Sequence, residues 1–186
     1  MNSNIRGAYT DMNGLVHIYT GNGKGKTTAA VGLAFRAWGR GMKVLMVQFL
    51  KGMESGEMIA AERLGPTFTI NPGTAMNKFT WEMNEAELKE ARLAQQKQFE
   101  YALREINSNQ WDMIILDEIM AAIHADMIAE INVLELIDKK PDILELVLTG
   151  RKAPEVLIEK ADYVSRIDGV KHPFSKGIHS RIGIEE

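Results

Sequence analysis

A glycine-rich segment near the start of the chain constrains its fold more than any other feature. The segment reads Thr20-Gly21-Asn22-Gly23-Lys24-Gly25-Lys26-Thr27-Thr28. It lies between an apolar run at residues 15–19 and a stretch with helical character at residues 27–38. Glycines let backbone N–H groups turn toward an anion, a helix N-terminus adds partial positive charge, and a lysine neutralises phosphate. A strand, this loop and a helix therefore predict a site for the phosphates of a nucleotide.

The loop departs from the usual phosphate-binding fingerprint in its first half. Gly25, Lys26 and Thr27 match the end of G-x-x-x-x-G-K-[ST]. The position five residues before Gly25 is Thr20, and counting from Gly21 leaves the loop one residue short. We expect a cradle of unusual shape on a solvent-facing loop, in which Lys26 touches phosphate oxygens and the Thr27 hydroxyl reaches Mg²⁺ or Mn²⁺. The alternative is an ordinary glycine-rich turn before a helix.

An acidic pair, Asp117-Glu118, follows a fully apolar run at residues 113–116. The carboxyl ends of parallel strands face the crevice where ligands bind in α/β sheets. Because the pair comes about 90 residues after the glycine-rich loop, we expect Asp117 to be a metal-site carboxylate. Three interpretations of Glu118 stay open: a second metal ligand, a group that orients water, or the first residue of the next helix.

Short apolar runs alternate with helical patterns along the whole chain, which is typical of a parallel sheet with crossover helices. We expect an α/β fold of the P-loop NTPase type (RecA-like), with a mostly parallel sheet and helices on both faces. Asn84 with Glu87, and Asn132 with Glu135, predict the capped starts of two helices. Expected strands cover residues 15–19, 43–49, 67–70, 113–116, 145–149 and 163–168, and expected helices 27–38, 56–64, 84–107, 132–139 and 154–161. We expect one domain over residues 1–186, with a short N-terminal extension (1–13) and a C-terminal tail (170–186).

Composition excludes several classes of protein. A net charge of −3 provides no general basic field for nucleic acid or an anionic membrane. The chain has no cysteine, which excludes disulfides and thiolate sites and fits a reducing cytoplasm. The first 13 residues lack the apolar core of a signal peptide, and no apolar run approaches the roughly 18 residues of a membrane span. We expect a cytoplasmic protein without nucleic-acid or membrane partners.

Two aromatic residues, Phe79 and Trp81, precede the long helix expected at residues 84–107. They could form an apolar lid over a flat ligand, or they could pack as a hydrophobic staple at the start of that helix. The segment 171–174 also has two interpretations: it is a basic turn, or it is a flap that contributes to a site.

Taken in order, these segments resemble the P-loop type of ATP:corrinoid adenosyltransferases of bacterial cobalamin biosynthesis and salvage. The resemblance runs from about Gly14 to the C-terminus. The matching segments are 20–28, Gln48-Phe49 with Lys51-Gly52, 79–82, 116–118, 148–151, 170–174 and 183–185. The chain departs from the family pattern at Asn77-Lys78, Met120-Ala121, Arg181 and Glu186.

The resemblance implies that the 5′-deoxyadenosyl group of ATP is transferred to Co(I) of a reduced corrinoid, either cobalamin or cobyrinic acid a,c-diamide, with release of tripolyphosphate. It implies that Phe79 and Trp81 bind the corrinoid and help to displace its lower axial ligand, which eases reduction of Co(II). A reduced flavoprotein is the implied electron donor, and a homodimer is the implied assembly. The expected ATP-binding residues are Gly21, Asn22, Gly23, Lys24, Gly25, Lys26, Thr27 and Thr28; the expected catalytic residues are Lys26, Asp117 and Glu118; and the expected metal ligands are Thr27, Asp117 and Glu118.

Two other functions stay open. A P-loop kinase or ATPase would act at the γ-phosphate and release ADP instead of tripolyphosphate. The other is a non-catalytic carrier of a corrinoid or a nucleotide. A cobalamin carrier would be expected to show Asp-x-His-x-x-Gly, which the sequence lacks. With an N-terminal extension of about 13 residues, we expect no long cover over the corrinoid.

Overall fold

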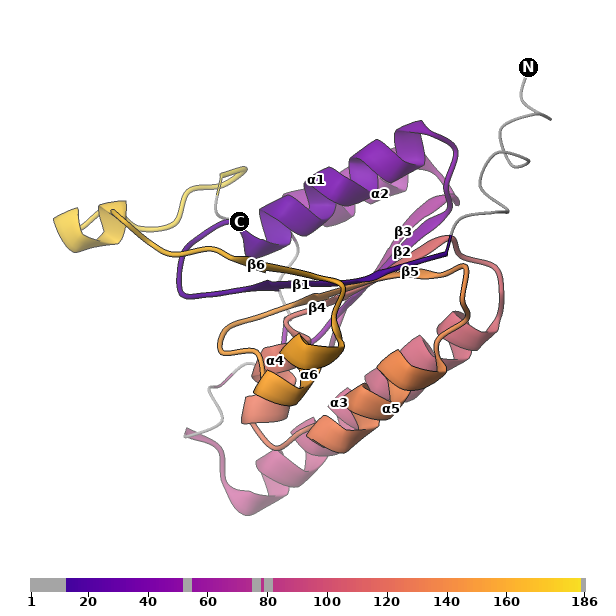
Figure 1. The fold of residues 1–186 in the computed structure, drawn as a ribbon. Helices are drawn as coiled ribbons and strands as arrows, with labels where there is room; N and C mark the ends of the chain where they lie inside the picture. Colours follow the sequence, from indigo (N-terminus) through magenta and orange to yellow (C-terminus); the bar gives the residue numbers. More distant parts are fainter. Residues whose placement is uncertain (1–12, 52–54, 75–77, 79–81, 185–186) are drawn as a thin grey trace.

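In the part of the chain that the structure describes, the strands form a single sheet in which all neighbouring strands run parallel. This computed structural model describes residues 13–51, 55–74, 78 and 82–184. Within them, six strands pair in parallel in the order β3-β2-β4-β5-β1-β6 (Figure 1). The strands are β1 (Val16–Thr20), β2 (Val44–Gln48), β3 (Phe68–Asn71), β4 (Met113–Asp117), β5 (Glu145–Thr149) and β6 (Tyr163–Arg166). The predicted α/β architecture is confirmed, and β5 separates β1 from β4.

Helices cover both faces of this sheet (Figure 1). α1 and α2 lie on one face, whereas α3, α4, α5 and α6 lie on the other. Their bounds are α1 (Lys26–Gly39), α2 (Gly56–Leu64), α3 (Glu85–Asn107), α4 (Ile119–His124), α5 (Glu130–Lys139) and α6 (Glu155–Lys160). None of the described helices combines the length and apolar character needed to cross a bilayer.

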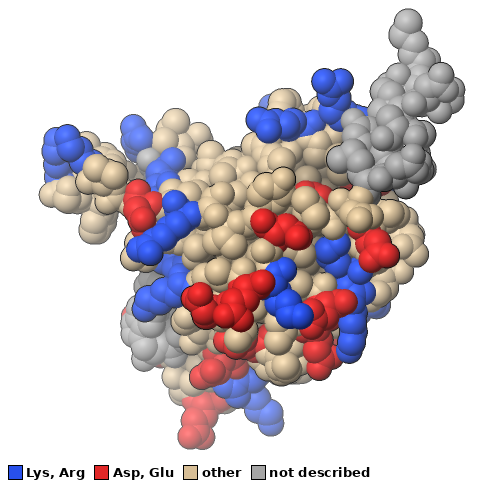
Figure 2. All heavy atoms as spheres, in the orientation of Figure 1, with Lys and Arg blue, Asp and Glu red and all other residues tan. Residues whose placement is uncertain are grey.

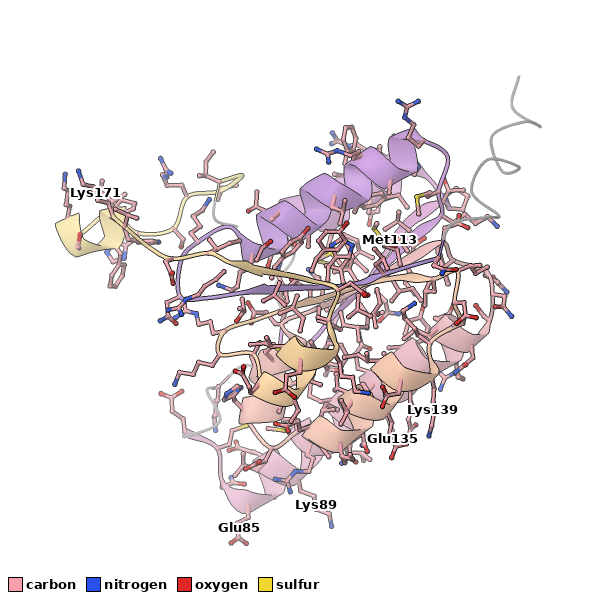
Figure 3. The ribbon with its side chains drawn as sticks, in the orientation of Figure 1. Glu85, Lys89, Met113, Glu135, Lys139 and Lys171 are labelled. Carbon is pink, nitrogen blue, oxygen red and sulfur yellow. The ribbon has the colours of Figure 1, made fainter. Side chains whose placement is uncertain are left out.

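The buried strands explain why the two helical layers hold the sheet. In β2, Leu45 and Val47 pack with α3, α4 and α5, while Met46 faces α1 and α2. Met113 at the start of β4 also lies on the α1 side (Figure 3). Strands buried on both faces appear in the sequence as continuous apolar runs, which is the pattern of a covered parallel sheet.

One predicted helix cap is confirmed and the other is wrong. Asn84 and Glu87 form a reciprocal capping box at the start of α3, with N–H···O distances of 3.0 and 2.9 Å. α5 instead begins at Glu130, so Asn132 lies inside its first turn, and no described side chain caps it. The cap pattern misleads here because Asn132 lies in the first turn of α5 and Glu135 lies beyond it, and both residue types also occur inside helices.

The C-terminal tail leaves the sheet after the edge strand β6 (Figure 1). The side chains of β6 are exposed, and the tail contains a short 3-10 helix at Pro173–Lys176. Lys171 lies on this projecting segment, away from the helical layers (Figure 3). On the face shown in Figure 2, Lys and Arg are interspersed with Asp and Glu. The predicted tail therefore has little regular structure, but part of it is helical.

The two asparagines give a matched test of the helix starts. Asn84→Ala removes the side-chain oxygen that accepts from Glu87 N–H in the capping box, so it should lower the free energy of unfolding by about 1 kcal/mol. Asn132→Ala should stay within about 0.5 kcal/mol of the parent protein because this exposed residue makes no cap. Urea denaturation measures both. A cost for Asn132→Ala as large as for Asn84→Ala would contradict the assigned start of α5.

Candidate active site at the carboxyl edge of the sheet

The glycine-rich loop has a backbone that glycine permits and other residues resist. Gly21 and Gly25 have φ angles of 106° and 119°, in the region that disfavours residues with a Cβ atom. A Cβ atom on Gly21 would also lie 2.3 Å from the carbonyl oxygen of Ile167. Gly25 ends the loop and directly precedes α1, whose first residue is Lys26. The predicted sequence of strand, loop and helix is therefore present.

Neighbouring segments hold the start of the loop in place. Ile167 accepts a hydrogen bond from Gly23 N (2.8 Å) and donates one to Thr20 O (2.8 Å). Thr20, which occupies the position of the usual first glycine, accepts a hydrogen bond at its hydroxyl from Ala153 N (3.1 Å). The threonine therefore anchors the loop to the connection between β5 and α6. This contact gives a physical reason for the unusual first half of the fingerprint.

Lys26 is buried under the loop rather than exposed on it. The residue is only 6% exposed, and its Nζ donates a hydrogen bond to Gly23 O at 2.9 Å. Burial lowers the pKa of Lys26, the charge of Glu118 opposes that shift, and Arg151 adds to it. The sequence predicts a solvent-facing loop, and Asn22 and Lys24 are exposed on it, but the Lys26 side chain is buried and contacts Gly23 O. An ammonium group in this position lies against the backbone that forms the cradle.

Asp117 joins the two halves of the site predicted from the sequence. Its Oδ1 accepts hydrogen bonds from Thr27 Oγ1 (2.9 Å) and from Thr149 Oγ1 (2.7 Å). Burial raises the pKa of Asp117, and the two hydroxyl groups partly counteract this effect. Thr27 and Asp117 are 90 residues apart in the sequence, and the parallel sheet brings them into contact.

Thr149 is a residue that the sequence reasoning did not assign to the site. It ends β5, the strand between β1 and β4, and is fully buried. Its hydroxyl donates to Asp117 and accepts from the backbone N–H of Glu118 (2.9 Å). The signal was a polar residue directly after the apolar run of a buried strand, the same signal that identified Asp117.

Glu118 has an unusual backbone conformation for its residue type. Its φ is 58°, in the left-handed region, and it immediately precedes α4. Burial and the charge of Asp117 raise the pKa of Glu118, while Lys26, Arg151 and Lys51 lower it. Strained residues persist where the surrounding structure holds them, often at functional sites. Glu118 therefore begins the next element and also belongs to the electrostatic environment of Lys26.

The oxygen donors near the loop suit a hard divalent cation. Thr27, Asp117 and Glu118 offer a hydroxyl and two carboxylates, which are the ligand types of Mg²⁺ or Mn²⁺. In the described ranges, no group of three or more His, Cys, Asp and Glu side chains gathers to hold a metal. Mg²⁺ usually takes one or two carboxylates and completes its shell with water and substrate phosphates. The residues present fit such a shared site.

The remaining residues predicted for the site are either exposed around the loop or lie outside the described residues. Asn22, Lys24 and Thr28 are exposed around the loop. Phe79 and Trp81 lie outside the described residues, so both interpretations of this aromatic pair remain predictions. Of the departures from the family pattern, Met120 is fully buried: a Cβ atom on Gly150 would lie 2.6 Å from its Cβ.

Comparisons with known proteins point to one family. Residues 12–185 match the family described as ATP:corrinoid adenosyltransferase BtuR/CobO/CobP. A corrinoid adenosyltransferase of Sinorhizobium sp. is 37% identical, over 97% of this chain and 84% of the relative. One of Escherichia coli (strain K12) is 36% identical, over 94% of this chain and 87% of the relative. Corrinoid adenosyltransferase CobA of Salmonella typhimurium is 34% identical, over 92% of this chain and 85% of the relative. With its phosphate loop and buried carboxylate in contact, the chain belongs to the ATP:corrinoid adenosyltransferase family.

Proposed function

We propose that this protein transfers the 5′-deoxyadenosyl group of ATP to the Co(I) centre of a reduced corrinoid and releases tripolyphosphate. The observation that carries the proposal is the hydrogen bond between Thr27 and Asp117, which joins the phosphate loop to the acidic end of β4. Family membership favours adenosyl transfer over the main alternative, a kinase or ATPase that acts at the γ-phosphate.

The residues of the loop would bind and orient the triphosphate. Lys26, exposed Lys24 and the backbone N–H groups of residues 21–28 other than Gly23, whose N–H donates to Ile167 O, would neutralise its charge. Thr27, Asp117 and Glu118 would hold Mg²⁺ or Mn²⁺, which supplies further neutralisation of the leaving polyphosphate when bound. Since reduced cobalt is itself a strong nucleophile, the protein mainly has to position two substrates and stabilise the leaving group.

Several further parts of the proposal rest on family resemblance. Phe79 and Trp81 would contact the corrinoid, displace its lower axial ligand and so ease reduction of Co(II). A reduced flavoprotein would donate the electron. The protein would act in the cytoplasm as a homodimer, with residues 1–186 of each chain forming one domain.

Lys26→Ala tests the phosphate loop. Loss of a charge-assisted contact should weaken ATP binding by about ten- to a hundredfold, and turnover should fall below detection. Calorimetry measures binding, and the visible spectrum of the adenosylated corrinoid measures turnover. Lys139→Ala, which breaks an exposed ion pair with Glu135 on α5 (Figure 3), serves as the control and should change neither. Normal ATP affinity in a folded Lys26→Ala protein would contradict the assignment.

Asp117→Asn tests the proposed metal site. The amide keeps an oxygen that can accept from Thr27 and Thr149, so the fold should survive, but the negative charge is lost. We expect the Mg²⁺ concentration for half-maximal activity to rise by about ten- to a hundredfold. Asp138→Asn, which alters an exposed ion pair with Lys160, is the control and should leave this Mg²⁺ concentration unchanged. Unaltered activity of Asp117→Asn at limiting Mg²⁺ would shift the metal-binding role to Glu118.

The double variant Phe79→Ala/Trp81→Ala separates corrinoid binding from helix packing. With cob(II)alamin and a flavin reductant, activity should fall severely, because the lower ligand stays on the cobalt. With cob(I)alamin made by a strong chemical reductant, much of the activity should return. Each tenfold difference between the two assays corresponds to about 1.4 kcal/mol of selective stabilisation.

Phe35→Ala provides the control for this pair, because Phe35 is an exposed aromatic residue on α1. It should behave like the parent protein in both assays. Equal losses of the double variant in both assays, in step with a lower melting temperature, would assign Phe79 and Trp81 to packing alone.

A further inference from the structure

A second polar group adjoins the phosphate site, on the side of Asp117 away from the glycine-rich loop. It consists of Gln48, Lys51 and Glu57, and we call it the β2 polar group. Gln48 pairs in register with Asp117, and the next residue, Phe49, donates its N–H to Asp117 O at 2.9 Å. The sheet order places β2 directly beside β4. The β2 polar group therefore starts one strand away from the proposed metal site.

The backbone that carries Lys51 is held in a fixed and strained path. Leu50 has a φ of 55°, which is rare for a bulky side chain. Two glutamines of α3 secure this turn: Gln95 Oε1 accepts from Leu50 N (3.1 Å), and Gln98 Nε2 donates to Gln48 O (3.2 Å). Such strain is maintained where the position of a side chain matters. The turn fixes where Lys51 leaves the backbone.

Contacts of Glu57 then set the direction of the Lys51 side chain. Lys51 Nζ forms an ion pair with Glu57 Oε1 at 2.5 Å, and Gln48 Nε2 donates to the same oxygen at 3.3 Å. Burial opposes the charge of Glu57, but the contacts with Lys51 hold the pKa of this carboxyl below its ordinary value. Glu57 therefore stays charged and keeps the ammonium group at the carboxyl edge of the sheet.

Lys51 follows β2 and Lys26 follows β1, so their backbone positions lie on opposite sides of β4, the strand that carries the acidic pair. Lys51 is three residues after Gln48, which pairs with Asp117, and two residues after Phe49, whose N–H donates to Asp117 O. Lys26 and Arg151 follow β1 and β5, the strands on the other side of β4. The acidic pair therefore lies between cations that approach from two directions.

Gln48 provides an independent sign that a ligand enters this space. The residue is fully buried, and its Oε1 has no hydrogen-bond partner among the residues that the structure describes. A buried acceptor without a donor is costly, and native proteins usually supply one. A hydrated ligand at the edge of β2 and β4 would bring the missing donor.

We propose that Lys51 is a further phosphate-binding residue, which contacts the polyphosphate of ATP from the side opposite Lys26, and that Glu57 and Gln48 position it. This rests on the proposed function, in which the electron pair of cobalt forms the bond to carbon 5′ and the carbon–oxygen bond breaks. The electron pair of that bond leaves on an oxygen of tripolyphosphate. Lys51 stabilises this anion as its charge grows.

Binding of inorganic tripolyphosphate with Mg²⁺, measured by calorimetry, tests the proposal without any corrinoid. Lys51→Ala should weaken binding by about tenfold or more, and Lys51→Arg should recover most of the loss. Lys160→Ala removes another lysine from an ion pair, far from the acidic pair in sequence, and should have no effect. The double exchange Lys51→Glu/Glu57→Lys should restore the ion pair and the melting temperature, but not the binding.

The outcomes separate this proposal from simpler accounts. Parent-like affinity in Lys51→Ala, or full recovery by the double exchange, would show an ion pair that only stabilises α2 and would overturn the proposal. A Lys51→Ala enzyme with a raised KM for cobalamin alone would overturn it too, because the anion recognised would then be the phosphate of the corrinoid. If the parent protein itself failed to bind tripolyphosphate, the proposed function would fail as well.

Discussion

The carboxylate of Asp117, buried between the hydroxyl groups of Thr27 and Thr149, is the interaction on which the rest of the site depends. It joins the ends of three elements: the start of α1 after the phosphate loop, β4 and β5. A buried charge is costly unless hydrogen bonds compensate it, and here two hydroxyl groups do so in part. The strand order makes the contact possible, because β5 brings Thr149 between β1 and β4.

The same edge of the sheet concentrates groups whose charged forms are disfavoured without a ligand. Burial raises the pKa of Asp117 and Glu118 and lowers that of Lys26, so each shift is toward the neutral form. Such shifts gather at functional sites, where a bound cation and a polyphosphate would restore the balance of charge. The strained backbone at Glu118 and Leu50 belongs to the same edge. The sheet and its two helical layers thus hold an arrangement that is unfavourable by itself.

Sequence reasoning predicted those parts that depend on local pattern. Every strand of the described sheet was expected within a few residues, and the pairing of Asp117 with Thr27 followed from the rule for parallel strand ends. It failed where tertiary contacts decide the outcome. The start of α5 was misplaced at Asn132, a helix after Glu118 was only one of three open interpretations of that residue, and Thr149 was not assigned. The burial of Lys26 depends on how the loop folds over it, which no periodicity in the sequence records.

The most direct measurement of the central claim is a quantitative analysis of the products formed from ATP and chemically reduced cob(I)alamin. The account predicts one tripolyphosphate for each adenosylated corrinoid, with no ADP above the level of a reaction without protein. Anion-exchange chromatography of the phosphates, together with the corrinoid spectrum, gives both quantities from one sample. ADP and inorganic phosphate formed without an adenosylated corrinoid would contradict the account and identify an enzyme that acts at the γ-phosphate.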